Sequence, residues 1–105
     1  MTARRRLLNR RTSSNFSFEC NGLRYVASIS FYPGTQQLAE IFIGNAKAGS
    51  QSDAAAKDSA VVASIALQHG VPMETIRHAL LRDSRGRAAS PLGEALDRIA
   101  KESAS

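Results

Sequence analysis

Cysteine is almost missing from this chain of 105 residues, and long apolar runs are missing altogether. The lone Cys20 excludes an internal disulfide and any metal site built from several cysteines. No apolar run approaches the roughly 20 residues that a helix needs to cross a bilayer, and the N-terminus lacks the apolar core of a secretory signal. These absences predict one small domain without a membrane segment, in a reducing, cytoplasmic setting.

Acidic side chains are missing from residues 1–13, which hold five of the 14 basic side chains of the chain. Because the other basic residues balance the nine acidic ones, the formal net charge of +5 resides in this segment. We expect a flexible basic arm that can contact phosphate, an anionic surface or an acidic protein. A solubilising tail without a partner is the alternative. The arginines of the arm are Arg4, Arg5, Arg6, Arg10 and Arg11.

Alternation of apolar and polar residues predicts three strands after the arm. Residues 16–20 and 23–31 flank Asn21 and Gly22, a two-residue hairpin turn whose positions both tolerate positive φ. A Pro-Gly turn then leads to a third strand over 38–43. The result is a three-stranded antiparallel meander with one face that needs a cover.

The second face of this sheet is more apolar than a fully solvated face. We place six residues on it: Arg24, Val26, Ser28, Leu38, Glu40 and Phe42. A small meander also has free edges that another strand could pair with. Both features favour a protein partner, which includes a second copy of this chain in a homodimer.

Helical signals fill the second half of the chain. Ser50 and Asp53 resemble a capping box, and the helix that they open runs to about residue 68. Val62, Ile65 and Ala66 lie on one stripe of it, with Ala63 and Leu67 beside them. Its many alanines allow a close approach of the helix backbone to the sheet: Ala54, Ala55, Ala56, Ala60, Ala63 and Ala66. Pro72 begins a second helix, with a buried stripe at Met73, Ile76, Ala79 and Leu80, and Ser90-Pro91 begins a third. The predicted fold class is α+β in the order β-β-β-α-α-α, with three helices on one sheet face, over residues 14–100, and frayed residues over 101–105.

The turn between the third strand and the first helix is a candidate anion or nucleotide site. Lys47, Gly49 and Ser50 bring a cation, backbone N–H groups and a hydroxyl to a helix start. The Gly-Lys-Ser/Thr sequence of a P-loop is missing. The alternative is a turn whose glycines serve geometry alone.

Other chemistry-bearing residues form no recognisable catalytic pattern. His69 and His78 are nine positions apart and lack further ligands, so no metal site and no cofactor are predicted. No nucleophile-elbow signature is present, and Cys20 alternates with phenylalanines as a core residue does. Arg85 and Arg87 flank Gly86 in a loop and are candidate nucleic-acid contacts beside the arm. We therefore expect a protein that is not an enzyme.

Several short segments are typical of one known domain. They are residues 40–43 (EIFI), 47–50 (KAGS), 58–59 (DS), 64–67 (SIAL), 70–72 (GVP), 91–93 (PLG) and 96–99 (LDRI). With them, residues from about 15 to 99 resemble the TSCPD-type domain, which occurs near the C-terminus of adenosylcobalamin-dependent (class II) ribonucleotide reductases and in small free-standing proteins of bacteria and phages. The Thr-Ser-Cys-Pro-Asp motif of that family is absent here.

The resemblance implies an accessory module that docks on a reductase, a nucleotide or another macromolecule. Radical nucleotide reduction needs several cysteines and a large barrel, which one cysteine and 105 residues cannot supply. The leading hypothesis is a non-enzymatic accessory domain that acts through protein or nucleotide contacts. The alternative is a nucleic-acid-binding protein that uses the arginine arm.

Overall fold

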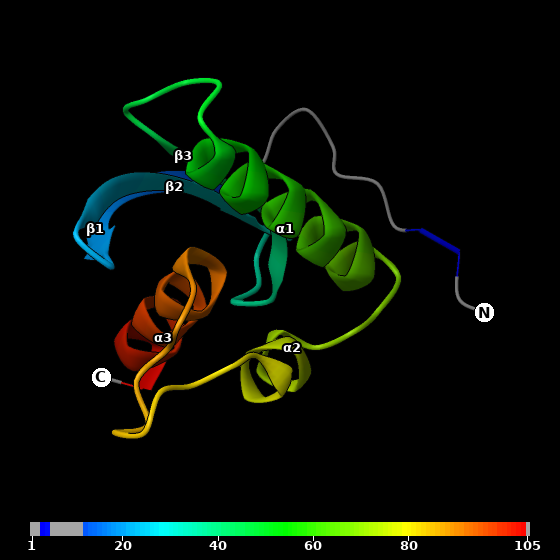
Figure 1. The fold of residues 1–105 in the computed structure, drawn as a ribbon. Coiled ribbons are helices and arrows are strands. Elements are labelled where there is room, and N and C mark those ends of the chain that lie inside the picture. Colours follow the sequence, from blue (N-terminus) through cyan, green and yellow to red (C-terminus); the bar gives the residue numbers. More distant parts are fainter. Residues whose placement is uncertain (1–2, 5–11, 105) are drawn as a thin grey trace.

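A computed structural model describes residues 3–4 and 12–104, and these form one sheet with helices against it (Figure 1). Within this part of the chain, the strands lie in the antiparallel order β1-β2-β3 and the helices follow them. The predicted α+β fold and its order of elements are therefore confirmed. The elements are β1 Thr12–Cys20, β2 Leu23–Phe31, β3 Leu38–Asn45, α1 Gln51–Gln68, α2 Met73–Ala79 and α3 Pro91–Ala104.

Local turn chemistry fixes the connections between these elements. Asn21 and Gly22 have φ of 52° and 80° and join β1 to β2 with Cys20 opposite Leu23, as the sequence predicts. In the next turn, the Thr35 N–H donates to the Tyr32 carbonyl at 3.0 Å. The predicted meander is thus confirmed at both turns.

The core lies between one face of the sheet and two of the helices, α1 and α3. Alanines line the side of α1 that faces the sheet, which lets the two backbones approach closely. α3 completes the core beneath β1 (Figure 1). The helical core residues are Ala56, Ala60, Ala63, Leu67, Leu92, Ala95, Leu96 and Ile99.

The sequence predicts the close approach of the α1 alanines to the sheet correctly, but the stripe through Val62 and Ile65 is wrong. Val62 is 66% exposed and Ile65 is 39% exposed, whereas Ala60 and Ala63 are buried. The helix lies so close to β3 that alanines and Ser64 fill most of the space between them, and its larger β-branched residues face outward. Hydrophobicity alone does not report this requirement, because it ranks valine above alanine.

Leu38 also departs from its predicted face. The register of the β2–β3 pair shifts next to Ser30 and Phe31, so that Leu38 pairs with Phe31 and Ala39 is an extra residue. As a result both Leu38 and Ala39 are buried, although strict alternation would place one of them outside.

Two ends and the burial of one helix differ from prediction. β1 begins at Thr12, inside the segment predicted to be a flexible arm. α3 continues to Ala104, through most of the segment predicted to fray. α2 has no fully buried residue: Met73, Ile76 and Leu80 pack partly buried against the core and Ala79 is exposed. α2 is therefore a peripheral element of the fold.

Candidate interaction site

The turn after β3 is built around the carboxylate of Asp53. This side chain is almost wholly buried and accepts hydrogen bonds from the backbone N–H groups of Asn45 at 2.9 Å and Gly49 at 3.2 Å. Its other close partner is the Lys57 ammonium at 2.8 Å. These contacts, with the lysine first, lower the pKa of Asp53 below its ordinary value. The turn therefore carries its own anion.

The three residues predicted to hold an external anion do meet in this turn, but their polar groups are used differently. Ser50 caps α1, because its Oγ accepts from the Asp53 N–H at 3.2 Å. The Gly49 N–H points to Asp53, and the Lys47 N–H donates to Asn45 Oδ1 at 2.9 Å. The exposed Lys47 side chain is thus the group of this trio that faces solvent as a cation.

Polar side chains of α1 close the outer edge of β3. Ser64 Oγ both accepts from the Ile41 N–H and donates to the Ile41 carbonyl, each at 2.9 Å. Gln68 Nε2 donates to the Ala39 carbonyl at 3.1 Å. Asp53 likewise accepts a hydrogen bond from the Asn45 N–H. Together these side chains pair with backbone groups of β3 that a fourth strand would otherwise bind. The expected homodimerisation through a free edge therefore has no room at β3.

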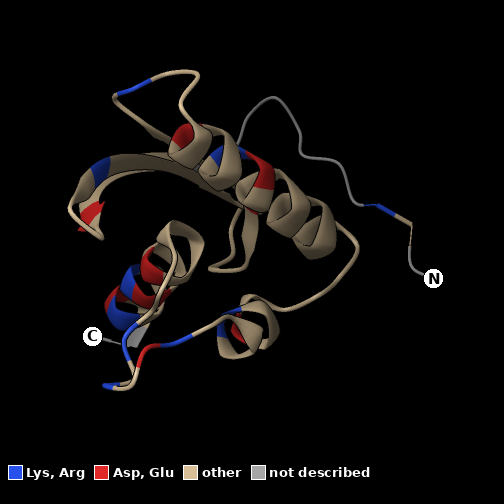
Figure 2. Ribbon diagram, viewed as in Figure 1, with Lys and Arg blue, Asp and Glu red and all other residues tan. Residues whose placement is uncertain are grey.

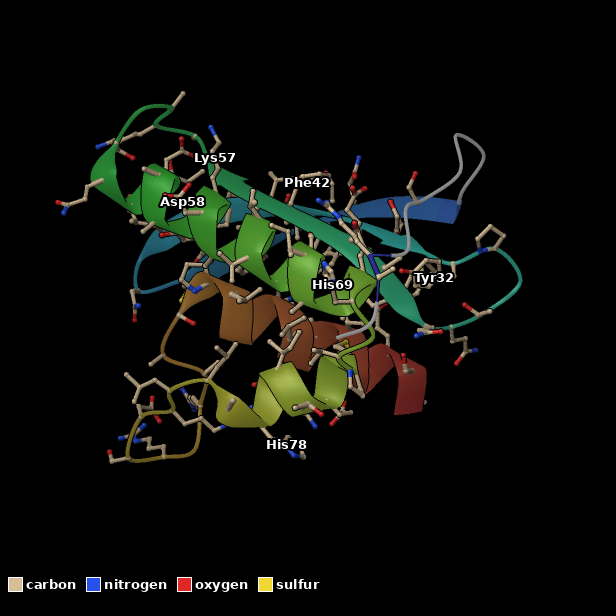
Figure 3. The ribbon with its side chains drawn as sticks, turned by 90° about the vertical axis from the view of Figure 1, so that its right-hand side faces the viewer. Tyr32, Phe42, Lys57, Asp58, His69 and His78 are labelled. Carbon is tan, nitrogen blue, oxygen red and sulfur yellow. The ribbon has the colours of Figure 1, made fainter. Side chains whose placement is uncertain are left out.

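The face of the sheet opposite α3 carries an apolar hollow of about 570 Å³. Val26 and Phe42 are each 48% exposed at its floor, and Val61 of α1 is 44% exposed at its wall. Figure 3 shows Phe42 and Lys57 on the same side of the sheet, away from α2. We call this the open-face hollow. It is lined by Arg24, Val26, Ser28, Phe42, Ile43, Gly44, Asn45, Ala46, Lys57 and Val61.

Gly44 shapes the open-face hollow by having no side chain. A Cβ at this position would lie 3.3 Å from both Asp53 Oδ1 and Lys57 Cε. The bare backbone lets Lys57 lie across β3, where its side chain lines the hollow together with Arg24 while its ammonium pairs with Asp53 at 2.8 Å. The hollow thus combines an apolar floor with the cation of Arg24 at its rim, which suits an apolar group next to a carboxylate.

Sequence reasoning found part of this site. Alternation along the strands pointed to Arg24, Val26 and Phe42 on the second face, as observed. It missed Lys57 and Val61, because their place depends on where α1 crosses the edge of the sheet. No periodicity in the sequence encodes that crossing.

The predicted nucleic-acid contacts that the structure describes, Arg4, Arg85 and Arg87, are not gathered into one surface. Arg4 donates from Nε to Gln68 Oε1 at 2.6 Å, at the end of α1. Arg85 and Arg87 are exposed in the loop before α3. Figure 2 shows residues 3–4 and this loop on opposite sides of the molecule. The other predicted contacts, Arg5, Arg6, Arg10 and Arg11, lie outside the described residues.

The remaining arginines near that loop are neutralised by carboxylates. Asp97 pairs with Arg82 at 2.7 Å and with Arg77 at 3.1 Å, and Arg77 also pairs with Glu74 at 2.8 Å. Arg82 first and Arg77 next lower the pKa of Asp97 below its ordinary value. This cluster forms a structural clasp between α2, the loop and α3.

The histidines and the cysteine lie apart. Cys20 is buried in the core, and burial first, then the charge of Glu94, raises the pKa of its thiol. Over residues 3–4 and 12–104, no three or more His, Cys, Asp or Glu side chains are grouped as metal ligands would be. Each helix in the described part of the chain is too short or too polar to span a bilayer.

Comparison with models of protein families, with curated proteins and with solved structures gave no match to this chain. Its function therefore has to be inferred from its own residues and their geometry.

Proposed function

We propose that this chain is a non-enzymatic accessory module that binds a protein partner through the open-face hollow. The observation that carries the proposal is the exposure of Val26 and Phe42 at 48% each on a sheet face that none of the described helices covers. A protein surface seldom leaves neighbouring large apolar side chains in water without a binding role. The module works in the cytoplasm in this proposal, where a lone thiol stays reduced.

The charges around the hollow define the segment that it binds. Arg24 lies at the rim beside Lys57, whose ammonium pairs with Asp53, and the floor is apolar. A partner segment with an aromatic or aliphatic side chain next to an Asp, a Glu or a C-terminal carboxylate satisfies both features. The resemblance to the TSCPD-type domain names the first partner to try, a class II ribonucleotide reductase.

Calorimetric titration of the purified reductase from the same genome into the full chain tests the proposal. We expect saturable binding that Phe42→Ala and Val26→Glu each weaken at least about tenfold, since the centre of an apolar interface carries most of its affinity. Val62→Glu is the matched control: it makes the same change at an exposed valine outside the hollow. Absence of binding, or equal loss with all three variants, contradicts the proposal.

The accessory module could instead act by binding a nucleotide through Lys47, Gly49 and Ser50. The exposed Lys47 ammonium favours it, whereas the use of the Gly49 N–H by Asp53 counts against it. Titration of nucleoside triphosphates into the wild type and Lys47→Ala decides between the modes. A saturable heat of binding in the wild type that is lost in Lys47→Ala supports nucleotide contact.

Nucleic-acid binding is the second candidate function, and the exposure of Arg85 and Arg87 at a loop favours it. Affinity for DNA or RNA should then fall steeply with salt, because neutralised phosphates release counterions. Because β1 begins at Thr12, removal of residues 1–11 spares the sheet while it deletes the arm arginines. Absent or salt-insensitive binding rules the function out, and salt-dependent binding that survives the deletion assigns it to Arg85 and Arg87 instead of the arm.

A further inference from the structure

The two edges of the sheet are finished differently. At the outer edge of β3, Ser64 and Gln68 of α1 bind the backbone. β1 stands at the other end of the order β1-β2-β3, and among residues 3–4 and 12–104 no strand pairs with its outer side. β1 therefore presents an edge to which a further strand can be added.

The backbone groups of alternate β1 residues point away from β2. A two-residue turn with positive φ at Asn21 and Gly22 makes Cys20 and Leu23 a hydrogen-bonded pair. Because such pairs alternate along an antiparallel ladder, every second residue counted back from Cys20 directs its N–H and C=O to β2. The residues between them direct these groups outward: Ser13, Asn15, Ser17 and Glu19.

The hydrogen bonds of β3 agree with this alternation. Ile29 of β2 lies between Ser14 of β1 and Ile41 of β3. Since Ile41 uses its N–H and carbonyl for Ser64, Ile29 directs its own groups to Ser14, as the alternation requires. The four outward residues of β1 therefore offer eight backbone groups, one donor and one acceptor each.

β1 lacks the devices that usually protect a free edge, such as proline, lysine, a bulge or a very short strand. It has nine residues, and its register with β2 runs without a shift from Thr12 to Cys20. Glu19 is its one charged residue. Its exposed positions otherwise carry small polar side chains, which let a strand approach: Ser13, Ser14, Asn15 and Ser17.

A hollow of about 540 Å³ lies beside this edge, between β1 and α3. Its apolar floor is Phe16, which is half-buried, and Ile99, which is buried. The described residues that line it belong to β1 and α3 alone, so it opens at the outer edge of β1. Figure 1 shows α3 beneath β1. We call this the β1–α3 hollow, and its lining differs throughout from that of the open-face hollow.

The charges around the β1–α3 hollow nearly cancel. Glu94 pairs with Arg98 at 3.3 Å, and Asp97 is neutralised by the arginines of the clasp. Lys101 and Glu102 bring one charge of each sign. The hollow therefore suits an uncharged side chain, aromatic or large and aliphatic, that packs on its apolar floor.

We propose that the β1 edge binds an extended segment of another protein, which joins the sheet as a fourth strand antiparallel to β1. The segment places an aromatic or large aliphatic side chain opposite Phe16, in the β1–α3 hollow, and an uncharged or basic residue opposite Glu19. Backbone hydrogen bonds supply the affinity and the hollow supplies the specificity. Eight such bonds approach the roughly ten of a typical protein interface.

A second copy of this chain fits the edge less well than a segment without a helix. A two-fold axis that pairs two β1 strands over their full length passes at Phe16, the middle of the strand, and residues near such an axis meet their own counterparts. Arg98 lines the hollow beside Phe16, with its guanidinium carbon 6.0 Å from the centroid of the Phe18 ring. Two Arg98 side chains would thus converge, and two α3 helices would compete for one hollow.

NMR titration of the isotope-labelled full chain with a synthetic peptide tests the proposal. The probe has nine residues and blocked ends, and it consists of threonines except for phenylalanine at its fifth position, opposite Phe16, and lysine at its second, opposite Glu19. We expect saturable shifts of the amide signals of β1 and α3 below about 1 mM, the weak limit of specific binding. Phe42→Ala, which alters the open-face hollow, should bind the peptide equally well.

Methylation of single peptide nitrogens distinguishes strand addition from other contacts. N-methylation of the fourth residue, whose N–H faces the backbone of Ser17, should weaken binding at least about tenfold, because it removes a hydrogen bond and adds a clash. N-methylation of the fifth residue is the matched control. Its N–H points away from β1, so the Kd should change less than about twofold.

Ser17→Pro makes the reciprocal change in the protein. It removes an outward N–H of β1 and leaves the bonds to β2 in place, so it should weaken binding of the unmethylated peptide at least about tenfold. Circular dichroism melting checks that the variant folds. The pair of methylated peptides needs no variant of the protein and decides the question by itself.

Three results overturn the proposal: no saturable shift up to about 1 mM, equal effects of the two methylations, or shifts confined to the open-face hollow. A free chain that sediments as a dimer and that Ser17→Pro makes monomeric places a second copy on the edge, which also overturns it. Binding at the open-face hollow depends on Phe42 and not on Ser17, so the two proposals fail independently.

Discussion

α1 and α2 are neighbouring helices that are attached to the protein by different kinds of contact. α1 presents buried polar side chains, above all Ser64 and Gln68, to the backbone of β3. α2 has no fully buried residue, and its arginine pairs with carboxylates at the surface. Deleting one partner of a buried hydrogen bond leaves the other unsatisfied, whereas a surface ion pair gives up its groups to water. This difference predicts that α2 opens long before α1 does.

The largest expected effect belongs to Ser64→Ala. This change leaves the N–H and carbonyl of Ile41 without their hydrogen-bond partner in a buried place, so we expect the free energy of unfolding to fall by about 3 kcal/mol. Chemical denaturation measures it. Ser59→Ala is the control, because the Ser59 Oγ donates only to the Ala56 carbonyl within the helix, and it should shift the value by less than about 0.5 kcal/mol. Equal effects would mean that the bonds to β3 do not anchor α1.

Gly93→Ala examines the joint between α3 and the loop after α2. A Cβ at Gly93 would lie 3.0 Å from Ala88 Cβ and 3.3 Å from Ser90 Oγ. Overpacking of this kind costs more than the roughly 1 kcal/mol that alanine gains over glycine in a helix, so we expect a net loss of about 1 kcal/mol. Thermal unfolding shows whether the variant is less or more stable than the wild type. A more stable variant would mean that the loop around Ala88 shifts without cost to make room for the added methyl group.

Asp97→Asn cuts the clasp that holds α2 to α3. The side chain is one-quarter exposed, so we expect only about 0.5–1 kcal/mol of global destabilisation. Amide exchange should reveal a local effect: faster exchange over residues 73–79 with unchanged exchange in α1. Arg98→Gln, which removes an exposed pair with Glu94 on α3, is the control and should leave both helices unchanged. Uniform acceleration in both helices would mean that α2 is not the weaker element.

The smallest effect concerns acid. The pKa of Asp97 is lowered from 3.8 in the folded protein, so between the two pKa values the unfolded chain binds more protons at this group than the folded protein does. Its contribution to stability is therefore present above pH 3.8 and lost as the pH falls through the folded pKa. The difference in melting temperature between the wild type and Asp97→Asn should therefore be constant near neutrality and shrink below pH 3.8. A difference that persists in strong acid would assign the effect to packing instead of charge.

The sequence predicted features that depend on contacts between residues close in the chain better than features that depend on distant ones. Asn21 with Gly22 at the hairpin and Ser50 at the helix start were predicted, because each acts through its own backbone or that of residues within one turn. The role of Asp53 was predicted only in part: its position near the helix start was expected, but its bonds to Asn45 and Gly49 depend on how the turn folds back. The outward Val62 was missed, since burial on α1 depends on the distance to the sheet.

The sequence by itself determined the kind and order of the elements, through strand alternation, turn residues and helix caps that operate over a few residues. Only the tertiary structure decided which side of α1 is buried, that Leu38 turns inward at a bulge, and that Ser64 and Gln68 seal the edge of β3. The physical reason is that these outcomes depend on the close approach of a helix to a strand edge. At that distance small side chains and well-placed hydrogen-bond partners outweigh hydrophobicity.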